Sequence, residues 1–367
     1  MKKKIKVLIV DDSAIVRQTL TEIYNSDAEI EVINVASNPY IAVKKIKEET
    51  PDVISLDIEM PGMDGLTFLC KIMAQHPIPV VIVSTLTEKG SETALQALRC
   101  GAVEVVGKPK IHTRELLLES TVTLCDAVRA AFHSKPEKRK SSSSELIIPK
   151  KNSADVIIKR KPTKPRETSD KVIAIGASTG GTKAVEELLL KMRSNCPGIV
   201  VVQHMPEMFT RSFSQRLNNL CEINVKEAED GDLIEKGRAL IAPGNRHMMA
   251  VRQGSHYKVK LDDGPLVNRH RPAVDVLFRS TALAAGRNSI GIILTGMGDD
   301  GAKGLLEMRE SGALTIAQDE ESCVVFGMPK EAIALGAADL VLPLQEIAPK
   351  VMSVYEYFES KLSRVSA

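Results

Sequence analysis

A serine in a glycine-rich turn is the first feature of this sequence that suggests chemistry. Residues 176–181 read GASTGG and follow the apolar run 172–175, so they satisfy the pattern G-x-S-x-G with Ser178 at its centre. Small residues permit a sharp turn that presents a serine hydroxyl above a sheet, where helix N-terminal N–H groups can stabilise an oxyanion. The motif alone is weak, because similar turns bind phosphates or only close a tight loop.

A nucleophilic serine needs a base, and the base needs a carboxylate to orient it. His204 follows the apolar run 199–202, and Asp300 follows the apolar run 289–294. If both runs are strands of the sheet that carries the serine, all three side chains face one crevice. The sequence therefore predicts a Ser-His-Asp catalytic site.

Other residues of the same types compete for these roles. His247 and His270 also lie in polar stretches, and His247 is the main rival to His204 as the base. Asp299 is the main rival to Asp300. The order Ser, His, acid differs from the order Ser, acid, His of the usual α/β-hydrolases, so we expect the catalytic geometry without that fold.

A second set of polar residues follows strand-like runs near the N-terminus, namely Asp11, Asp12, Asp57, Ser84 and Lys108. The carboxyl ends of parallel strands meet at one edge of a sheet, so these groups are expected to share a pocket. Three carboxylates with room for water suit Mg²⁺. We predict that Asp57 is a phosphate-accepting nucleophile, that the three aspartates hold the metal, and that Ser84 and Lys108 contact phosphate oxygens.

The elements around this second set alternate between apolar runs and amphipathic stretches. Unbroken apolar strands interleaved with helices indicate a parallel α/β sheet covered on both faces. The predicted strands are 7–10, 32–36, 53–56, 80–83 and 103–106, and the predicted helices are 14–24, 39–48, 66–75, 91–100 and 113–132.

The C-terminal half shows a second α/β alternation. Its predicted strands are 172–175, 199–202, 238–241, 289–294, 314–317 and 339–341, with helices that include 182–193 and 301–310. A hairpin around Gln253 and Gly254 interrupts the alternation, so we expect a mostly parallel sheet of mixed type.

Between the two halves the composition changes to serine, lysine, arginine and proline, with too few apolar residues to offset the entropy of ordering. We predict domains at 1–132 and 171–360 joined by a flexible linker at 133–170. The linker's basic residues are more simply explained by solvation than by binding of nucleic acid.

Composition limits the function classes. The 367 residues suffice for two domains, and 49 Lys and Arg balance 47 Asp and Glu, so bulk charge favours neither nucleic acid nor an anionic membrane as a partner. Six scattered cysteines without CxxC pairs predict reduced thiols and a cytoplasmic location. We expect no signal peptide and no membrane insertion.

Two resemblances extend these predictions. Residues 1 to about 130 resemble the response-regulator receiver family through VDDS at 10–13, LDIEMPGMDG at 56–65 and KP at 108–109. Residues 171 to about 355 resemble the catalytic domain of the chemotaxis protein-glutamate methylesterases. Three motifs carry that match, GASTGG, QHMP at 203–206 and TGMGDDG at 295–301, with APG at 242–244 and RPAVDVLF at 271–278 in support.

The resemblances imply a flavodoxin-like receiver and an esterase domain that demethylates receptor glutamates and deamidates some receptor glutamines. The implied nucleophile is Ser178, the base His204 and the orienting acid Asp300, with Thr179 and Met297 near the oxyanion. Many family members carry Asn where this chain has Asp299. The implied partners are methyl-accepting chemotaxis receptors as substrate and a chemotaxis histidine kinase as phosphodonor. The esterase reaction itself needs no cofactor.

Two other functions are weighed against this one. A DNA-binding response regulator would need a recognition helix with a basic face, whereas residues after the linker are glycine-rich and α/β in pattern. A receiver-linked esterase for small metabolites would share the catalytic residues and differ only in substrate.

Overall fold

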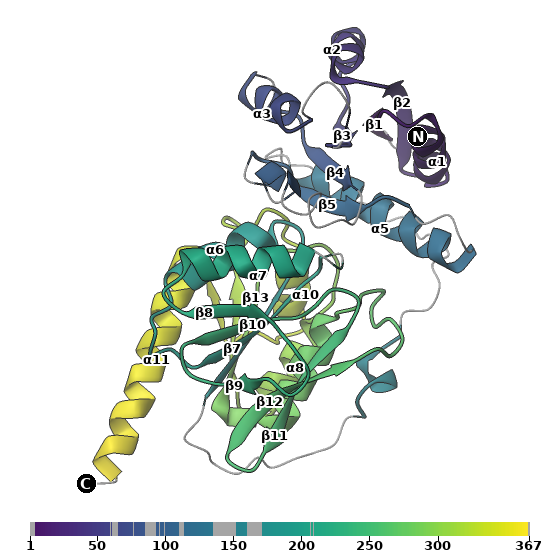
Figure 1. Ribbon diagram of the computed structural model, residues 1–367. Helices are drawn as coiled ribbons and strands as arrows, with labels where there is room; N and C mark the ends of the chain where they lie inside the picture. The colour runs from purple at the N-terminus through teal and green to yellow at the C-terminus, as the bar shows by residue number, and fades with distance from the viewer. Residues whose placement is uncertain are drawn as a thin grey trace. The chain divides into compact units, whose positions relative to one another are not determined.

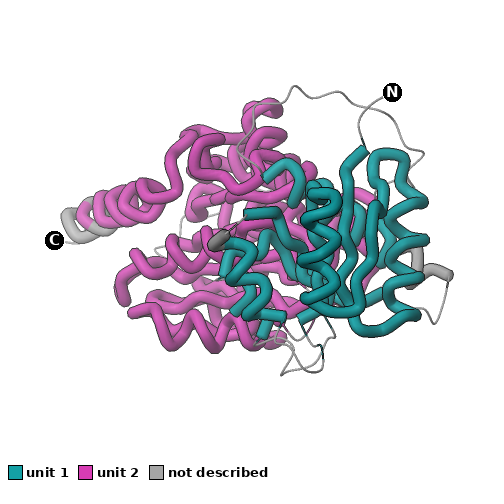
Figure 2. The backbone as a smooth tube through the Cα atoms, turned by 90° about the horizontal axis from the view of Figure 1, so that it is seen from above, with its two compact units in different colours: residues 1–147 teal, residues 148–367 magenta. Residues whose placement is uncertain are grey.

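The chain divides into two compact units, residues 1–147 and 148–367, which are described separately (Figure 2). The computed structural model describes residues 4–58, 60, 65–75, 77–84, 93–94, 96–98, 100–109, 114–134, 152–159, 171–205, 207 and 209–365. Parts of the predicted helix 91–100, most of the predicted linker and Pro206 of the QHMP motif lie outside these residues.

The first unit is a five-stranded parallel sheet in the order β2-β1-β3-β4-β5, flanked by helices (Figure 1). Its strands are β1 (Ile5–Val10), β2 (Ile30–Ala36), β3 (Val53–Leu56), β4 (Val80–Ser84) and β5 (Glu104–Gly107). Its helices are α1 (Ala14–Asn25), α2 (Pro39–Glu48), α3 (Gly65–Gln75) and α5 (Arg114–His133). The predicted doubly wound architecture is confirmed, since β3 and β4 are buried at every position.

Side-chain caps explain where two of these helices begin. The hydroxyl of Ser13 accepts a hydrogen bond from the N–H of Val16 at the start of α1. The side chain of Asn38 does the same for Ile41 in α2, whose first residue is Pro39. Both caps satisfy N–H groups that have no partner within the helix. The strand-to-helix turn after β1 therefore leaves Asp11 and Asp12 outside the helix, at the sheet edge.

The second unit contains a seven-stranded parallel sheet in the order β15-β14-β13-β6-β7-β10-β8. Its strands are β6 (Val172–Ala177), β7 (Gly198–Gln203), β8 (Asn224–Glu227), β10 (Arg238–Ile241), β13 (Ser289–Ile293), β14 (Leu314–Gln318) and β15 (Leu340–Leu342). The three strands β13, β6 and β7 are adjacent and buried at every position. Their carboxyl ends therefore bring three loops together.

Helices pack in two groups around this sheet (Figure 1). In one group α6 (Gly181–Leu190) contacts both α7 (Phe209–Leu220) and the long C-terminal helix α11 (Leu344–Val365). In the other, α9 (Ala302–Glu310) contacts both α8 (Val274–Ala284) and α10 (Met328–Ala334). None of the described helices has the combination of length and hydropathy needed to span a membrane.

The predicted hairpin is present but does not join the main sheet. β11 (His247–Gln253) and β12 (His256–Asp262) pair antiparallel around Gly254, and β9 (Leu233–Ile234) adds a third strand. The expectation of a mixed main sheet is therefore wrong, because the antiparallel strands form a separate sheet. This small sheet packs on α8 through the half of β11 that is buried.

Two observations bear on the predicted linker and cysteines. Residues 152–159 fall within the predicted linker range, yet they form a short helical turn, η1 (Ala154–Val156), packed on the second unit.

Cys70 and Cys100 form a disulfide with Cα atoms 5.3 Å apart. The prediction that all cysteines are reduced is wrong for this pair, because α3 and the turn before β5 bring together residues that sequence spacing does not relate. Cys125, Cys196, Cys221 and Cys323 are free thiols.

Candidate functional site

Ser178 sits in the turn between β6 and α6, and backbone bonds hold that turn. The N–H of Ser178 donates to the backbone oxygen of Thr295 at 3.0 Å, and its own backbone oxygen accepts from Gly181 at 2.7 Å. Gly180 has φ +77°, and a Cβ there would lie 2.5 Å from Cβ of Val324. Glycine is thus required both by the left-handed backbone and by the close approach of the neighbouring loop.

His204 begins the loop after β7, directly beside the serine turn. Strand register pairs Ala177 with Gln203, the last residues of β6 and β7, so Ser178 and His204 follow paired positions. The N–H of His204 also donates to the backbone oxygen of Ala177 at 3.0 Å. Gln203 adds a bridge, because its Nε2 donates to the backbone oxygens of Ser178 at 2.9 Å and of His204 at 3.1 Å.

Asp300 is a buried carboxylate bonded to His204. Its Oδ2 lies 2.8 Å from Nε2 of His204 and also accepts from the N–H of Val274 at 2.7 Å. Its Oδ1 accepts from the side-chain amide of Asn268 at 2.8 Å and the N–H of Asp275 at 3.1 Å. Burial alone raises a carboxyl pKa, but the hydrogen bond and charge of His204 outweigh it and hold the pKa of Asp300 well below its usual range.

The hydrogen bond to Asp300 uses only one of the two ring nitrogens of His204. With Nε2 bonded to Asp300, the nitrogen Nδ1 is buried and makes no hydrogen bond to any described residue. The imidazole stacks on that of His270, with ring centroids 3.7 Å apart and planes 10° apart. An ionised Asp300 favours the tautomer that carries its proton on Nε2, which leaves Nδ1 free to accept a proton.

His247 and Asp299, the alternative base and acid, have other surroundings than His204 and Asp300. His247 is fully buried, its Nε2 lies 2.9 Å from the backbone oxygen of Pro265, and its Nδ1 accepts from the N–H of Ala273 at 3.3 Å. Burial lowers the pKa of His247, which favours the neutral form that those two bonds require. Asp299 is half-buried, whereas the bond to His204 is made by Asp300. The structure thus brings His204 and Asp300 together and leaves both rivals outside that pair.

Sequence reasoning missed two neighbours of this pair. Asn268 donates from Nδ2 to Asp300 and to Oδ2 of Asp275, the latter at 2.6 Å. Asp275 also accepts from the N–H of Gly304 at 2.7 Å, and burial together with the charge of Asp300 raises the pKa of Asp275 to about 7. No pattern in the sequence points to Asn268, because its contacts link its own loop to the start of α8 and to the turn before α9.

Thr179 and Met297, the residues expected near an oxyanion, lie in the two loops that meet at Ser178. Thr179 is buried, and its backbone oxygen accepts a hydrogen bond from the hydroxyl of Thr295 at 3.0 Å. Met297 is half-buried and follows Gly296, where a Cβ would lie 2.7 Å from Cβ of Ser178. The loop after β13 therefore passes directly over the serine.

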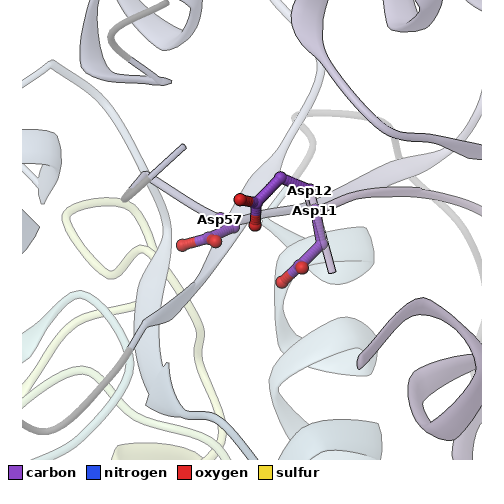
Figure 3. A group of neighbouring side chains, drawn as sticks. All are labelled: Asp11, Asp12 and Asp57. Carbon is purple, nitrogen blue, oxygen red and sulfur yellow. The ribbon is translucent and has the colours of Figure 1, made fainter. Parts of the chain in front are cut away.

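The acidic residues of the first unit also cluster. Ligand oxygens of Asp11, Asp12 and Asp57 all lie within 4.8 Å of one another, as Figure 3 illustrates. Nζ of Lys108 lies 2.7 Å from Oδ2 of Asp57 and 3.0 Å from Oδ2 of Asp11. Burial by itself lowers the pKa of Lys108, but the bonds and charges of the two carboxylates outweigh it and raise that pKa. Ser84 ends β4 and is buried.

This donor set fits a hard cation. All three ligands are carboxylates, the type that Mg²⁺ prefers, and Asp12 is exposed, so water can complete the coordination. The structure thus brings together four of the five residues that the sequence predicted at this edge, namely Asp11, Asp12, Asp57 and Lys108.

Comparisons with known proteins cover both units. Residues 173–351 match the family model described as CheB methylesterase, and residues 7–119 match the response regulator receiver domain. A relative from Geobacter metallireducens, named protein-glutamate methylesterase/protein-glutamine glutaminase 3, is 58% identical over 351 residues, which cover 95% of this chain and 99% of the relative. A relative from Anaeromyxobacter dehalogenans, with the same name numbered 5, is 57% identical over 95% of this chain and 96% of its own length.

A solved structure is similar to the second unit. The Thermotoga maritima CheB methylesterase catalytic domain is 42% identical, covers 50% of this chain and 98% of its own length, and has a TM-score of 0.49. The alignments with these two relatives, each over 95% of this chain, extend across both matched regions. The chain belongs to the family of protein-glutamate methylesterases/protein-glutamine glutaminases that carry a receiver domain.

Proposed function

We propose that this enzyme hydrolyses glutamate γ-methyl esters on methyl-accepting chemotaxis receptors, deamidates some receptor glutamines, and does so under the control of phosphorylation. The observation that carries the proposal is the 2.8 Å bond between His204 and Asp300, which leaves the buried Nδ1 of His204 without a partner among the described residues, beside the turn of Ser178. Family membership supplies the substrate class.

The proposed acyl transfer uses Ser178, His204 and Asp300 as a unit. The hydroxyl of Ser178 attacks the ester carbonyl while Nδ1 of His204 takes its proton, and Asp300 holds the imidazole and stabilises its cation. The imidazolium then protonates the leaving methoxide, and methanol departs. Water activated by the same imidazole releases the glutamate. Deamidation follows the same steps with ammonia as the leaving group.

Stabilisation of the oxyanion is assigned to the turn after β6. Ten-residue helix α6 begins at Gly181, so its positive end faces the turn that holds Ser178 and Thr179. Met297 belongs to the loop whose Gly296 lies against Ser178 and is proposed to line the same site. These assignments make the enzyme a serine carboxylesterase that needs no metal for hydrolysis.

The receiver is proposed to accept phosphate on Asp57 from a chemotaxis histidine kinase. Asp11, Asp12 and Asp57 would hold Mg²⁺, which screens the charge of an incoming phosphoryl group. The carboxylate of Asp57 attacks phosphorus, while Lys108 and Ser84 contact the phosphoryl oxygens. Lys108 would exchange its present ion pair with Asp57 for the phosphoryl group.

We infer that the unphosphorylated receiver restrains the esterase and that phosphorylation releases it. A full switch from 1:99 to 99:1 needs about 5.5 kcal/mol of differential stabilisation, and a smaller shift still regulates. A receiver at 1–132, an esterase core at 171–360 on which residues 152–159 pack, and a cytoplasmic location are part of the same proposal. Neither nucleic acid nor membrane insertion has a role in it.

The proposal is tested by methanol release from membranes that contain methylated receptor, with and without acetyl phosphate. We expect release by the full chain and a higher rate with the phosphodonor. A panel of soluble methyl esters assayed beside the receptor separates a receptor enzyme from a small-metabolite esterase. Preference for a soluble ester, or no release from receptor, would contradict the proposed substrate.

A further inference from the structure

Residues 152–159, which we call the docked segment, are built into the second unit. Ala154 is 3% exposed and belongs to a small apolar cluster, against which Ile157 and Ile158 also pack. The other members of that cluster are Met249, Val267, Ala273 and Val276. The fit is close, because a Cβ on Gly264 would lie 2.3 Å from Cδ1 of Ile157. The segment is therefore attached through Ala154 and the two isoleucines, while Asn152, Asp155, Val156 and Lys159 are exposed.

A buried guanidinium anchors the same segment. Arg279 on α8 is 7% exposed, and its Nη1 donates to Oδ1 of Asp155 at 2.8 Å and to the backbone oxygen of Ile158 at 3.0 Å. Its remaining donors bind both carboxylate oxygens of Glu307 at 2.8 and 2.7 Å. The guanidinium is buried whereas the side chain of Asp155 is 60% exposed, so a buried charged donor holds a segment that lies at the surface.

The segment is also bonded to the loop beside the catalytic pair. The backbone oxygen of Asn152 accepts from the N–H of Asn268 at 3.0 Å, and its side-chain amide donates to the backbone oxygen of Leu266 at 3.1 Å. Asn268 and Arg269 have φ of +50° and +73°, the left-handed region that costs energy for residues other than glycine. Two successive residues in this region persist only when their surroundings hold them.

Asn268 connects that strained loop to the catalytic carboxylate. Its side chain is buried and donates to Oδ1 of Asp300 at 2.8 Å, while the other oxygen of Asp300 bonds His204. The same amide nitrogen also donates to Asp275. A continuous series of hydrogen bonds thus runs from Asn152 through Asn268 and Asp300 to His204.

We propose that the docked segment is a working part of the esterase, which holds Asn268 in the conformation that orients Asp300. Asn268 is a positioning residue in this account, and the distal end of the interdomain connection is a point at which the catalytic centre can be adjusted. The inference rests on the proposed function and adds a regulatory input to the same site.

The first test compares Ala154→Glu with Val156→Glu in the full chain. Both place the same charge in the same turn, but Ala154 is buried whereas Val156 is 49% exposed. We expect Ala154→Glu to lower kcat for methanol release roughly 10- to 100-fold with KM nearly unchanged, since misplacement of a catalytic group affects the chemical step. Val156→Glu should stay within about twofold of the wild type. Equal kcat in the two variants contradicts the proposal.

A double-mutant cycle tests whether the docked segment affects catalysis through Asn268. If the segment acts through Asn268, Ala154→Glu should have little further effect on kcat in an Asn268→Ala background. Multiplicative losses would show that the segment acts by another path and would overturn the positioning role. Should Ala154→Glu fail to fold, Ile157→Ala against Val156→Ala gives the same comparison with a smaller disturbance.

A readout without turnover separates this inference from the proposed function. Release of the segment should increase amide hydrogen exchange at residues 266–270 in Ala154→Glu and not in Val156→Glu. If wild type releases no methanol from receptor, the proposed function fails while the exchange result still decides whether the segment holds the loop. Unchanged exchange in both variants contradicts the inference even if the enzyme is active.

Discussion

The side-chain amide of Gln203 donates a hydrogen bond of 2.9 Å to the backbone oxygen of Ser178. The same nitrogen donates to the backbone oxygen of His204 at 3.1 Å, so a single side chain ties together the loops of the proposed nucleophile and base. Gln203 is 2% exposed, which makes this bridge hard to replace with water.

Replacement of Gln203 by glutamate should separate the two loops. Gln203→Glu turns a buried donor into an acceptor that faces two carbonyl oxygens, and we expect kcat for methanol release to fall roughly 10- to 100-fold. The control is Gln253→Glu, the same change at an exposed position of β11, which should leave kcat unchanged. Wild-type kcat in Gln203→Glu would show that the bridge has no catalytic role.

Gly180→Ala should destabilise the protein by more than the positive φ angle alone would cause. A methyl group there meets Cβ of Val324 at 2.5 Å, in addition to the cost of φ +77°. Gly231→Ala is the matched control, because φ is +90° and nothing lies within 4 Å of the new Cβ. We expect Gly180→Ala to lose about 1–3 kcal/mol more of unfolding free energy than the control, measured in urea, and to lose esterase activity. Equal losses would contradict the clash.

Asp275 should make stability depend on pH. Its pKa is raised to about 7 in the folded state by burial and by Asp300, so between the unfolded value and 7 the folded state binds more protons than the unfolded state. The stability that this group contributes is present below its ordinary carboxyl pKa and is lost as pH rises through 7. Asp275→Asn removes that loss.

The check is thermal unfolding of wild type and Asp275→Asn at pH 5 and pH 8. The Tm of the variant relative to wild type should rise by a few degrees between the two pH values. A relative Tm that stays constant or falls would mean that Asp275 does not titrate in this window. Asp263→Asn, which changes an exposed carboxylate of a surface ion pair, serves as the control.

Removal of divalent cations should affect the receiver alone. EDTA is expected to abolish labelling of Asp57 by acetyl phosphate, because Asp11, Asp12 and Asp57 supply only carboxylate oxygens. Methanol release by the unphosphorylated chain should be unchanged, since its proposed residues are a serine, an imidazole and a carboxylate. Loss of unstimulated release in EDTA would contradict a metal-free esterase.

The positions of most strands, and the edge of the sheet at which polar residues gather, could be predicted because both depend on local sequence. Unbroken apolar runs such as 80–83 and 199–202 predict buried parallel strands, and polar residues at strand ends then share an edge. This is why His204 and Asp300 were candidates before any contact was known, whereas their choice over His247 and Asp299 rested on the family resemblance. The sequence pattern predicted the hairpin but not that it belongs to a separate antiparallel sheet, because such a pattern does not indicate which strands the hairpin pairs with.

Contacts that link distant loops could not be predicted from the sequence. Asn268 donates hydrogen bonds to Asp275 and Asp300 from a loop with left-handed backbone. Nothing in the sequence around Asn268 indicates that this polar side chain is buried. Asn152 and Ala154 lie among polar residues typical of a linker, so their docking depends on a surface formed by α8 and the loop before it. The Cys70–Cys100 pair depends likewise on how α3 and the turn before β5 meet.

The most direct test of the account is methanol release from methylated receptor by Ser178→Ala. Ser255→Ala, at an exposed hairpin position, is the matched control, and labelling of Asp57 by acetyl phosphate verifies that the receiver of each protein is folded. We predict that Ser178→Ala loses roughly a thousandfold or more in kcat while it still accepts phosphate, because the two sites share no residue. Undiminished methanol release by Ser178→Ala would contradict the central claim.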